Sequence, residues 1–495
     1  MGHEQERGGG AGHLLLFPFL AQGHIIPFLN LAKHIERLEQ PRRPRITVVS
    51  TPRHVASLRR AEPAGSSIRF AELPFCPSDH GLPADAESTD VIPFMDFTAF
   101  FLATESLQAP FEKLVSELAA RDGCKNVCVL ADFFLGWTAE SARKLGVQHR
   151  LFVTSGAYAS AATFSIWLRQ PTFPRPVSPD DEQALVDFPD VRLRHEQLLN
   201  VIITEDDSNP MTRFLRRTLN LHFRHSGGVV VNTAEEIEAK GLEMIGKLSG
   251  LPTFAVGPLI GSRAPTADTV RVDDGDAACI KFLDSKPPAS VLFVSFGSQN
   301  TIPASQMMEL ARGLEASGRP FIWVVRPPAE FDGAAEFRAD EWLPAGFEAR
   351  VAAAGRGVVV RRWAPQVAVL AHASTGAFLS HCGWNSVLES LWHGVPVVGW
   401  PLMSDQLFDS RLLVELGVGV EVASGRVVGG LPLDKGWEHV RDVVETVLGD
   451  GDKARGMRAK AAELKKLARA AVSADGKVKG SSVLAMERLL DGAFR

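Results

Sequence analysis

A histidine and an aspartate each follow a short apolar run in the first third of the chain. His24 comes after the run Leu14–Phe17, and Asp132 comes directly after Val127–Ala131. We expect both runs to be strands of one parallel sheet, whose carboxyl ends gather polar side chains at one edge. A histidine at such an edge can exchange a proton near neutral pH. A lone histidine at a helix start is more often only a solvated side chain, so its position alone leaves both interpretations open.

A second group of polar side chains lies between Trp363 and Gln406, in the stretch WAPQVAVLAHASTGAFLSHCGWNSVLESLWHGVPVVGWPLMSDQ. Its pattern predicts a strand over Ala377–Ser380, a loop up to Asn385 and a helix over Ser386–His393. The unpaired N–H groups and the dipole at such a helix start attract anions, of which phosphate is the commonest. The stretch therefore predicts a phosphate-bearing ligand.

Structural interpretations explain several of these residues one at a time. Ser386 and Glu389 have the spacing of a capping box, which is sufficient to start a helix. Four tryptophans of this stretch can all be core residues, namely Trp363, Trp384, Trp392 and Trp400. The joint pattern favours a binding site, because histidine, asparagine, serine, glutamate and the pair Asp405-Gln406 all fall at strand-to-helix junctions, where open α/β sheets bind ligands.

Strands and helices alternate along the whole chain. The expected strands are Leu14–Phe17, Ile46–Ser50, Ile68–Leu73, Val127–Ala131, Leu151–Thr154, Val229–Asn232, Val291–Phe296, Phe321–Arg326, Val358–Arg361, Ala377–Ser380 and Val395–Gly399. Most are continuous apolar runs, which are typical of strands buried on both faces. A helical period separates them, and Pro27 marks the expected start of the first helix. This alternation predicts two doubly wound parallel sheets.

The domain boundary is expected in Gly257–Asp276, which is rich in Gly, Pro, Ala and Asp and has no periodicity. We therefore divide the chain into a first domain at 1–258, a linker at 259–278 and a second domain at 279–470. The proline-rich stretch Gln170–Asp190 predicts a surface loop.

The composition is that of an ordinary globular protein, with 495 residues, 45% apolar and 22% charged, and a net charge of -5. No basic face is indicated, so neither nucleic acid nor an anionic membrane is expected as a partner. The five cysteines have the spacing of neither a disulfide framework nor a zinc site. No signal peptide or run of about 18 apolar residues occurs, and we expect a cytoplasmic protein without integral membrane association.

The stretch from Trp363 to Gln406 resembles, in order and spacing, the signature segment of plant family-1 UDP-glycosyltransferases. Weaker similarities run along the chain at Gly23-His24, Val230–Thr233 with Glu236, Val256–Leu259 and Ser295–Ser298. The resemblance implies the GT-B fold, in which two Rossmann-like domains face each other across a cleft, with the acceptor on the N-terminal side and the donor on the C-terminal side. It also implies that a last helix, within 471–495, packs back on the N-terminal domain.

The resemblance further implies how a UDP-sugar is held. The uracil would stack on Trp363 beside the Ala364 backbone, and the ribose would be held by Gln366 and Glu389. The diphosphate would be bound by Ser298, His381, Asn385 and Ser386, and the sugar would contact Trp384, Asp405 and Gln406. Gly383, as a glycine, lets the backbone approach the ligand closely. Glutamine at the last position accompanies glucose preference in this family, so UDP-glucose is the expected donor.

In the same family the sequence Ala-Gln-Gly-His belongs to the catalytic loop, which implies that His24 is the base and that Asp132 orients it. Neutral His24 would take the acceptor proton, and Asp132 would fix its tautomer and support the imidazolium. A single displacement would invert the anomeric carbon. His381 and the helix start at Ser386 would absorb the diphosphate charge, so no metal or other cofactor is expected. The Asp-Gly-Asp sequences at 274–276 and 450–452 fall in expected polar loops and are not expected to bind metal.

The acceptor is the part of the reaction that the sequence defines least. Aromatic residues fall in regions that line the acceptor pocket in relatives, foremost Phe97, Phe133, Phe134 and Trp137, together with Phe94, Phe100, Phe101, Phe164 and Trp167. By this analogy we expect a flavonoid, phenolic or terpenoid-like alcohol and a monomeric enzyme.

Two other classes remain as alternatives on a Rossmann-like fold. A nicotinamide-dependent oxidoreductase needs G-x-G-x-x-G after the first strand, where this chain has Phe-Leu-Ala-Gln-Gly-His. A non-catalytic binding protein needs neither His24 nor Asp132.

Overall fold

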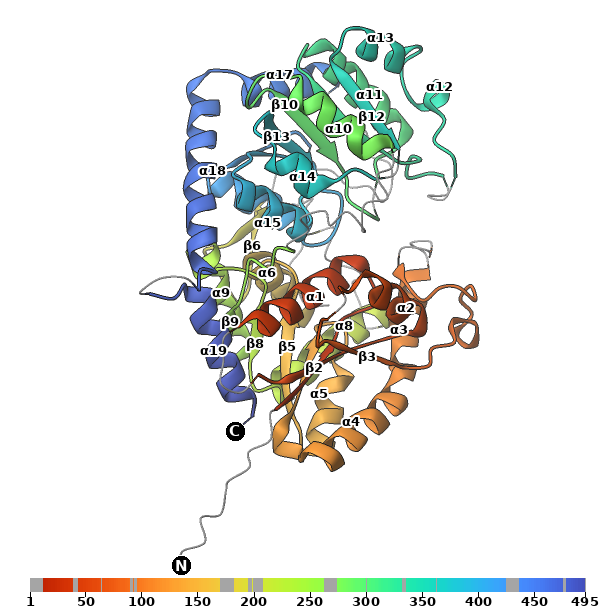
Figure 1. Cartoon of the computed structure of the whole chain (residues 1–495), viewed down its shortest axis with the longest axis vertical. Helices are drawn as coiled ribbons and strands as arrows, with labels where there is room; N and C mark the ends of the chain where they lie inside the picture. Colours follow the sequence, from red (N-terminus) through yellow and green to blue (C-terminus); the bar gives the residue numbers. More distant parts are fainter. Residues whose placement is uncertain are drawn as a thin grey trace, which may run out of the picture.

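The computed structural model describes residues 12–38, 43–63, 65–89, 92, 96–169, 182–194, 198, 208–261, 274–299, 301–331, 335–361, 363–423, 436–474 and 478–494 of the 495-residue chain. They form two α/β lobes, the N-terminal half of the chain in one and most of the C-terminal half in the other (Figure 1). Each lobe is built around one parallel sheet, as the alternation of strands and helices predicts.

The sheet of the N-terminal lobe has seven parallel strands in the order β3-β2-β1-β4-β5-β8-β9. Their bounds are β1 His13–Phe17, β2 Arg45–Ser50, β3 Arg69–Glu72, β4 Val127–Asp132, β5 Gln148–Val153, β8 Val229–Val231 and β9 Thr253–Ala255. β9 was not predicted, because its three residues are only partly buried and form no apolar run. The strand order reverses between β1 and β4, where Phe17 pairs with Ala131, and this is the place at which open α/β sheets bind ligands.

The helices of this lobe are α1 Gln22–Arg37, α2 Pro52–Ala61, α3 Phe97–Ala103, α4 Gln108–Asp122, α5 Trp137–Leu145, α6 Ala157–Arg169, α8 Pro210–His225 and α9 Glu235–Ser249. The predicted start of the first helix is wrong. α1 begins at Gln22, so His24 lies in its first turn and Pro27 lies inside the helix. Pro27 has no N–H to donate to the carbonyl of Gly23, and that carbonyl accepts a hydrogen bond from the other lobe, as described below.

The predicted loop at Gln170–Asp190 is partly a hairpin. β6 (Glu182–Ala184) pairs antiparallel with β7 (Arg192–Arg194), while residues 170–181 lie outside the described part of the chain.

The sheet of the C-terminal lobe has six parallel strands in the order β12-β11-β10-β13-β14-β15. Their bounds are β10 Val291–Ser295, β11 Phe321–Val325, β12 Gly357–Arg361, β13 Thr375–Ser380, β14 Val397–Gly399 and β15 Gly419–Glu421. The helices around it are α10 Asp274–Asp284, α11 Ala304–Ala316, α12 Ala339–Trp342, α13 Phe347–Ala353, α14 Gln366–Ala371, α15 Trp384–His393, α16 Gln406–Glu415 and α17 Trp437–Leu448. The order reverses between β10 and β13, so this lobe repeats the arrangement of the first.

The start of α15 differs from the prediction. The helix begins at Trp384 behind Gly383, whose extended backbone caps it without a side-chain hydrogen bond. Ser386 lies inside the first turn, and the capping-box interpretation of Ser386 and Glu389 is therefore wrong. Gly394, with a φ of 74°, ends the helix as predicted.

Two helices at the end of the chain connect the lobes (Figure 1). α18 (Asp452–Ala471) contacts α15 and α17 in one lobe and α9 in the other. α19 (Ser481–Ala493) packs on β9, and its apolar face enters the core of the N-terminal lobe. Of the range 259–278, residues 262–273 lie outside the described residues, and α10 already begins at Asp274. None of the helices in the described part of the chain is long and apolar enough to cross a bilayer.

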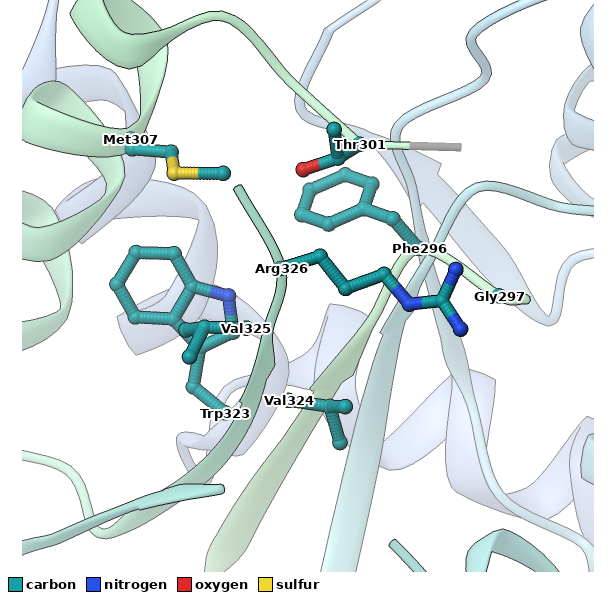
Figure 2. A pocket seen from close by; sticks show the side chains of 8 residues that line it. All are labelled: Phe296, Gly297, Thr301, Met307, Trp323, Val324, Val325 and Arg326. Atoms are coloured by element: carbon teal, nitrogen blue, oxygen red, sulfur yellow. The ribbon is translucent and has the colours of Figure 1, made fainter. Parts of the chain in front are cut away.

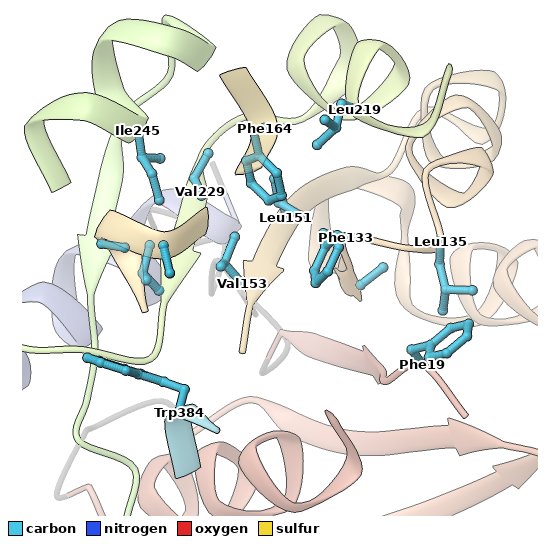
Figure 3. Packing of buried hydrophobic residues seen from close by; sticks show 14 of the residues in the cluster. Phe19, Phe133, Leu135, Leu151, Val153, Phe164, Leu219, Val229, Ile245 and Trp384 are labelled. Atoms are coloured by element: carbon cyan, nitrogen blue, oxygen red, sulfur yellow. The ribbon is translucent and has the colours of Figure 1, made fainter. Parts of the chain in front are cut away.

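One apolar core continues from the N-terminal lobe into the C-terminal lobe. Trp384, Val387 and Leu391 of α15 belong to the same buried cluster as the strands of the first lobe. Figure 3 shows Trp384 at the edge of that cluster. Its Nε1 donates a hydrogen bond to the carbonyl oxygen of Asn232 at 2.7 Å. A large ring buried with its polar atom paired fixes the first turn of α15 against the other lobe.

Candidate active site

Two side chains meet at the carboxyl ends of β1 and β4. His24 Nδ1 lies 2.7 Å from Asp132 Oδ2, although 108 positions separate the residues. Asp132 is fully buried, and its Oδ1 accepts a hydrogen bond from Phe134 N–H at 3.1 Å. Thr154 Oγ1, just after β5, lies 3.2 Å from His24 Nδ1. A carboxylate held in this way keeps the proton on Nδ1 and leaves Nε2 of His24 as the nitrogen that can accept a proton.

The surroundings of His24 favour its protonated form. Burial alone would lower the pKa of the imidazole, but the charge of Asp132, its hydrogen bond and a smaller contribution from Asp405 raise the pKa above its ordinary value. Asp405 belongs to the C-terminal lobe, at the N-cap of α16. Burial raises the pKa of Asp405, against a hydrogen bond from Ser155 and the charge of His24. The two lobes are therefore coupled electrostatically at this point.

The loop from His381 to Gly383, between β13 and α15, packs tightly against the loop after β10. A Cβ atom at Gly297 would lie 2.7 Å from the His381 ring, and one at Gly383 would lie 2.5 Å from it. Cys382 has a φ of 64° and its N–H is held by Ser380 Oγ at 3.1 Å. Such strain in a non-glycine backbone is typical of functional loops. Burial lowers the pKa of His381 to about 4, so the ring is uncharged near neutral pH.

Arg326 reaches the same region from the end of β11, and Figure 2 shows its side chain extending towards Gly297. Its Nη1 donates to the carbonyl oxygen of Ser298. A small recess between the ends of β10 and β11 is lined by Arg326, Gly297 and Thr301 among others. Arg326 was expected only as the last residue of a strand, whereas β11 ends at Val325 and Arg326 follows it directly, as a polar residue at the edge of the sheet. Arg326 thus places a positive charge against the loop that follows β10 and contains Ser298 (the Ser298 loop).

Three of the expected donor residues form one hydrogen-bonded group. Gln366, the first residue of α14, donates from Nε2 to Glu389 Oε2 at 2.7 Å and to Ser386 Oγ at 3.0 Å. Ser386 thus lies with the pair expected to hold the ribose, whereas the resemblance implies a diphosphate contact for it. Burial raises the pKa of Glu389 to about 7, against the hydrogen bond from Gln366. Just before α14, the Trp363 side chain is 58% exposed and Ala364 is buried, which leaves an aromatic face open to a planar ligand.

The residues expected to contact the sugar already form hydrogen bonds within the protein. Gln406 Oε1 accepts hydrogen bonds from the N–H groups of Leu402 and Met403 at 3.0 and 3.2 Å, so its amide can offer only the nitrogen to a ligand. The Trp384 indole is buried between the lobes, so only its backbone can contact a sugar. Asp405, immediately before Gln406, is the neighbouring acceptor.

Asn385, in the first turn of α15, crosses to the other lobe. Its Nδ2 donates to the carbonyl oxygen of Gly23 at 2.9 Å. Gly23 precedes His24 in the first turn of α1, so the starts of two helices from different lobes are joined. The amide nitrogen has a second N–H for the diphosphate contact that the resemblance implies.

Aromatic rings surround the imidazole of His24. Their centroids lie at 5.5 Å for Phe134, 5.6 Å for Phe19 and 5.8 Å for Phe133. Phe19 was not predicted, because its place in the turn after β1 shows no pattern of its own. These rings provide an apolar surface beside the base.

The other expected acceptor residues lie further from His24. Phe97, in the first turn of α3, is half-buried and contacts this group through Phe101. Trp137 is only 2% exposed and packs edge to face against Phe17 and Phe111. It is therefore a core residue, and its prediction as an acceptor residue is wrong. Phe94 lies outside the described residues.

Among the described residues, no three His, Cys, Asp or Glu side chains gather where they could hold a metal ion. The first Asp-Gly-Asp sequence opens α10 instead of forming a loop. In the second, Asp450 and Asp452 are exposed and lie beside arginines of α18.

These features define a class of protein. Two Rossmann-like lobes, with a His–Asp pair at the switch point of one and a strained loop before a helix start at the switch point of the other, are the arrangement of a GT-B glycosyltransferase.

Comparisons with known proteins identify the family. The family model described as UDP-glucoronosyl and UDP-glucosyl transferase matches residues 271–429. UDP-glycosyltransferase 92A1 of Arabidopsis thaliana is 38% identical over 486 residues, which are 97% of each chain. Crocetin glucosyltransferase 3 of Crocus sativus is 39% identical over 426 residues, 81% of this chain and 84% of that one. The chain belongs to the plant family-1 UDP-glycosyltransferases and is an enzyme of that class.

Solved structures of related enzymes have the same fold over nearly the whole length of this chain. UGT73P12 of Glycyrrhiza uralensis, complexed with glycyrrhetinic acid 3-O-monoglucuronide, has a TM-score of 0.81 at 27% identity, covering 98% of this chain and 96% of that one. UGT2 of Phytolacca americana, complexed with UDP-2fluoro-glucose and pterostilbene, has a TM-score of 0.75 at 27% identity, covering 98% and 99%. The predicted GT-B fold is confirmed, and the oxidoreductase and non-catalytic alternatives are set aside.

Proposed function

We propose that this enzyme transfers glucose from UDP-glucose to a hydroxyl of a small apolar acceptor, with inversion of the anomeric carbon and without a metal ion. The observation that carries the proposal is the 2.7 Å contact between His24 Nδ1 and the buried carboxylate of Asp132. His24 Nε2 removes the acceptor proton as the acceptor oxygen attacks the anomeric carbon and UDP leaves from the opposite side. Asp132 stabilises the imidazolium that forms.

The leaving diphosphate is stabilised by N–H donors. The first turn of α15 presents backbone N–H groups that have no helical partner, and Asn385 adds a side-chain N–H. His381 contributes as a neutral donor, because burial keeps its pKa low. Arg326 supports the Ser298 loop with a positive charge. Donors fixed before the reaction can take the role of a divalent cation in such a site.

The donor and acceptor are assigned from chemistry and from relatives. Asp405 and the Gln406 amide nitrogen are suited to the hydroxyls of a hexose. Relatives with 34% identity are named scopoletin glucosyltransferase of Nicotiana tabacum and UDP-glucose flavonoid 3-O-glucosyltransferase 7 of Fragaria ananassa, which supports glucose and a small aromatic or apolar alcohol. The rings of Phe19, Phe133 and Phe134 suit such an acceptor.

Release of UDP tests the proposal. The protein is incubated with UDP-glucose and a panel of flavonoid, phenolic and terpenoid alcohols, and the anomeric configuration of each product is determined by NMR. We expect β-glucosides from the α-linked donor. A retained configuration would contradict the single displacement. A preference of more than about tenfold in kcat/KM for UDP-galactose or UDP-glucuronate, or roughly 1.4 kcal/mol in transition-state binding, would contradict the assignment of glucose.

A further inference from the structure

One carbonyl in the first turn of α1 has no donor within its own helix. In an α-helix the carbonyl of residue 23 accepts from the N–H of residue 27. That residue is Pro27, which has no N–H, and α1 nevertheless continues to Arg37. The Gly23 carbonyl is therefore left without its helical donor.

The donor comes from the other lobe. Asn385 Nδ2 donates to this carbonyl at 2.9 Å, across 362 positions of sequence. Gly23 is exposed, and a Cβ atom added to it would meet nothing within 4 Å.

Both ends of this hydrogen bond adjoin groups that the proposed mechanism uses. Gly23 directly precedes His24 in the chain, and the imidazole Nδ1 of His24 lies 2.7 Å from Asp132 Oδ2. Asn385 directly follows Trp384, whose indole N–H donates to the carbonyl oxygen of Asn232 in the first lobe at 2.7 Å. The turn that carries the base and the turn that starts α15 are thereby held in one relative position.

We propose that Pro27 is a positioning residue of the transfer reaction. By withholding an N–H it reserves the Gly23 carbonyl for Asn385, and so aligns His24 with the start of α15. The inference rests on the proposed function, which gives these two turns the base and the leaving diphosphate. The second N–H of the Asn385 amide stays available for the diphosphate, so one side chain spans the base turn and the leaving group.

Pro27→Ala tests this role because alanine restores the N–H that can close the bond to Gly23 within α1. We expect kcat with a weakly acidic acceptor to fall by roughly threefold to tenfold, the size of one net hydrogen bond. With a strongly acidic phenol, which ionises unaided, the loss should nearly vanish, because alignment of the base no longer matters. The control is Pro52→Ala: this exposed proline is the first residue of α2 and its missing N–H releases no carbonyl of that helix.

A double-mutant cycle separates positioning from packing, since Pro27 is buried. In an Asn385→Ala background, Pro27→Ala should cause no further loss of kcat. An equal loss in both backgrounds, or an equal loss with both acceptors, would overturn the inference.

A crystal structure of Pro27→Ala decides the question without turnover. We expect the backbone N–H that the substitution introduces to bond the Gly23 carbonyl and the Asn385 amide to leave it. An unchanged contact between Asn385 and Gly23 would overturn the inference even if the wild-type enzyme transfers glucose. Failure of the wild-type protein to transfer glucose would instead reject the proposed function, while this structure would still decide the role of Pro27.

Discussion

Replacing Asp132 with asparagine tests how the base is supported. Asp132 Oδ2 accepts from His24 Nδ1 at 2.7 Å and Oδ1 accepts from Phe134 N–H at 3.1 Å, so an amide cannot satisfy both donors. The variant also removes the main charge that raises the pKa of His24. A hydrogen bond to a charged group is worth about 1.5–3 kcal/mol, and the charge on His24 develops in the transition state. We therefore expect kcat to fall by roughly 10- to 150-fold.

The assay is kcat/KM against pH with a weakly acidic acceptor, since this ratio reports the free enzyme. Transfer needs neutral His24, so activity is lost as pH falls through the pKa of His24. Asp132→Asn lowers that pKa and should move the acidic limb to lower pH. His24→Ala should lower kcat by on the order of 10^2 to 10^4, and the double variant should be little worse. Multiplicative losses, or an acidic limb that does not move, would refute the reasoning.

A second histidine–aspartate pair supplies a matched control. His13 Nδ1 lies 3.0 Å from Asp122 Oδ2, and His13 begins β1, at the end of the strand away from His24. A hydrogen bond from Arg121, with others from His13 and Arg45, holds the pKa of Asp122 below its ordinary range. Its contribution to stability is present above the ordinary carboxyl pKa and is lost as pH falls. Asp122→Asn should therefore lower stability at neutral pH and leave the acidic limb of kcat/KM in place.

Donor binding, metal dependence and the contact between the lobes can each be tested. Burial raises the pKa of Glu389 to about 7. The ionised carboxylate accepts from both ribose hydroxyls more strongly than the protonated form, so the KM for UDP-glucose should fall as pH rises through that value. A flat profile, or one that Glu389→Gln preserves, contradicts this. Activity should survive excess EDTA, and a loss that Mg2+ or Mn2+ restores would contradict the metal-free mechanism. Trp384→Phe removes the bond to Asn232 and should lower the free energy of unfolding by about 1 kcal/mol in a denaturant titration, whereas an unchanged value would show that the bond adds no net stability.

The two switch points could be predicted because their signals are local. Each central strand is a continuous apolar run, and the polar residue that follows it projects from the carboxyl edge of the sheet. Asp132 and His381 are found in this way, whereas Arg326 was included in its expected strand and so was missed. Short strands on the less buried flanks, such as β9, give no comparable signal.

The errors arise where a residue's partner is distant in sequence. Pro27 suggests a helix start, since nothing nearby shows that Asn385 will serve the carbonyl that Pro27 leaves unpaired. Ser386 and Glu389 have capping-box spacing, yet Gln366 bonds both of them. Trp137 is an aromatic residue of the kind that lines acceptor pockets, but its ring packs against Phe17 and Phe111. In each case tertiary contacts outweigh a local pattern that is correct in isolation.

The proposed chemistry of the site draws on both lobes. Asp132 supports His24 from within its own sheet, but Asp405 adds its charge from the other lobe. Burial keeps the pKa of His381 low, so in the proposed mechanism the diphosphate charge is relieved by the N–H groups at the start of α15 and by Arg326. That helix start is in turn fixed by Trp384 to the first lobe. Separation of the lobes would remove the charge of Asp405 from the base and part the turn that carries His24 from the turn that starts α15, because Asn385 joins these two turns.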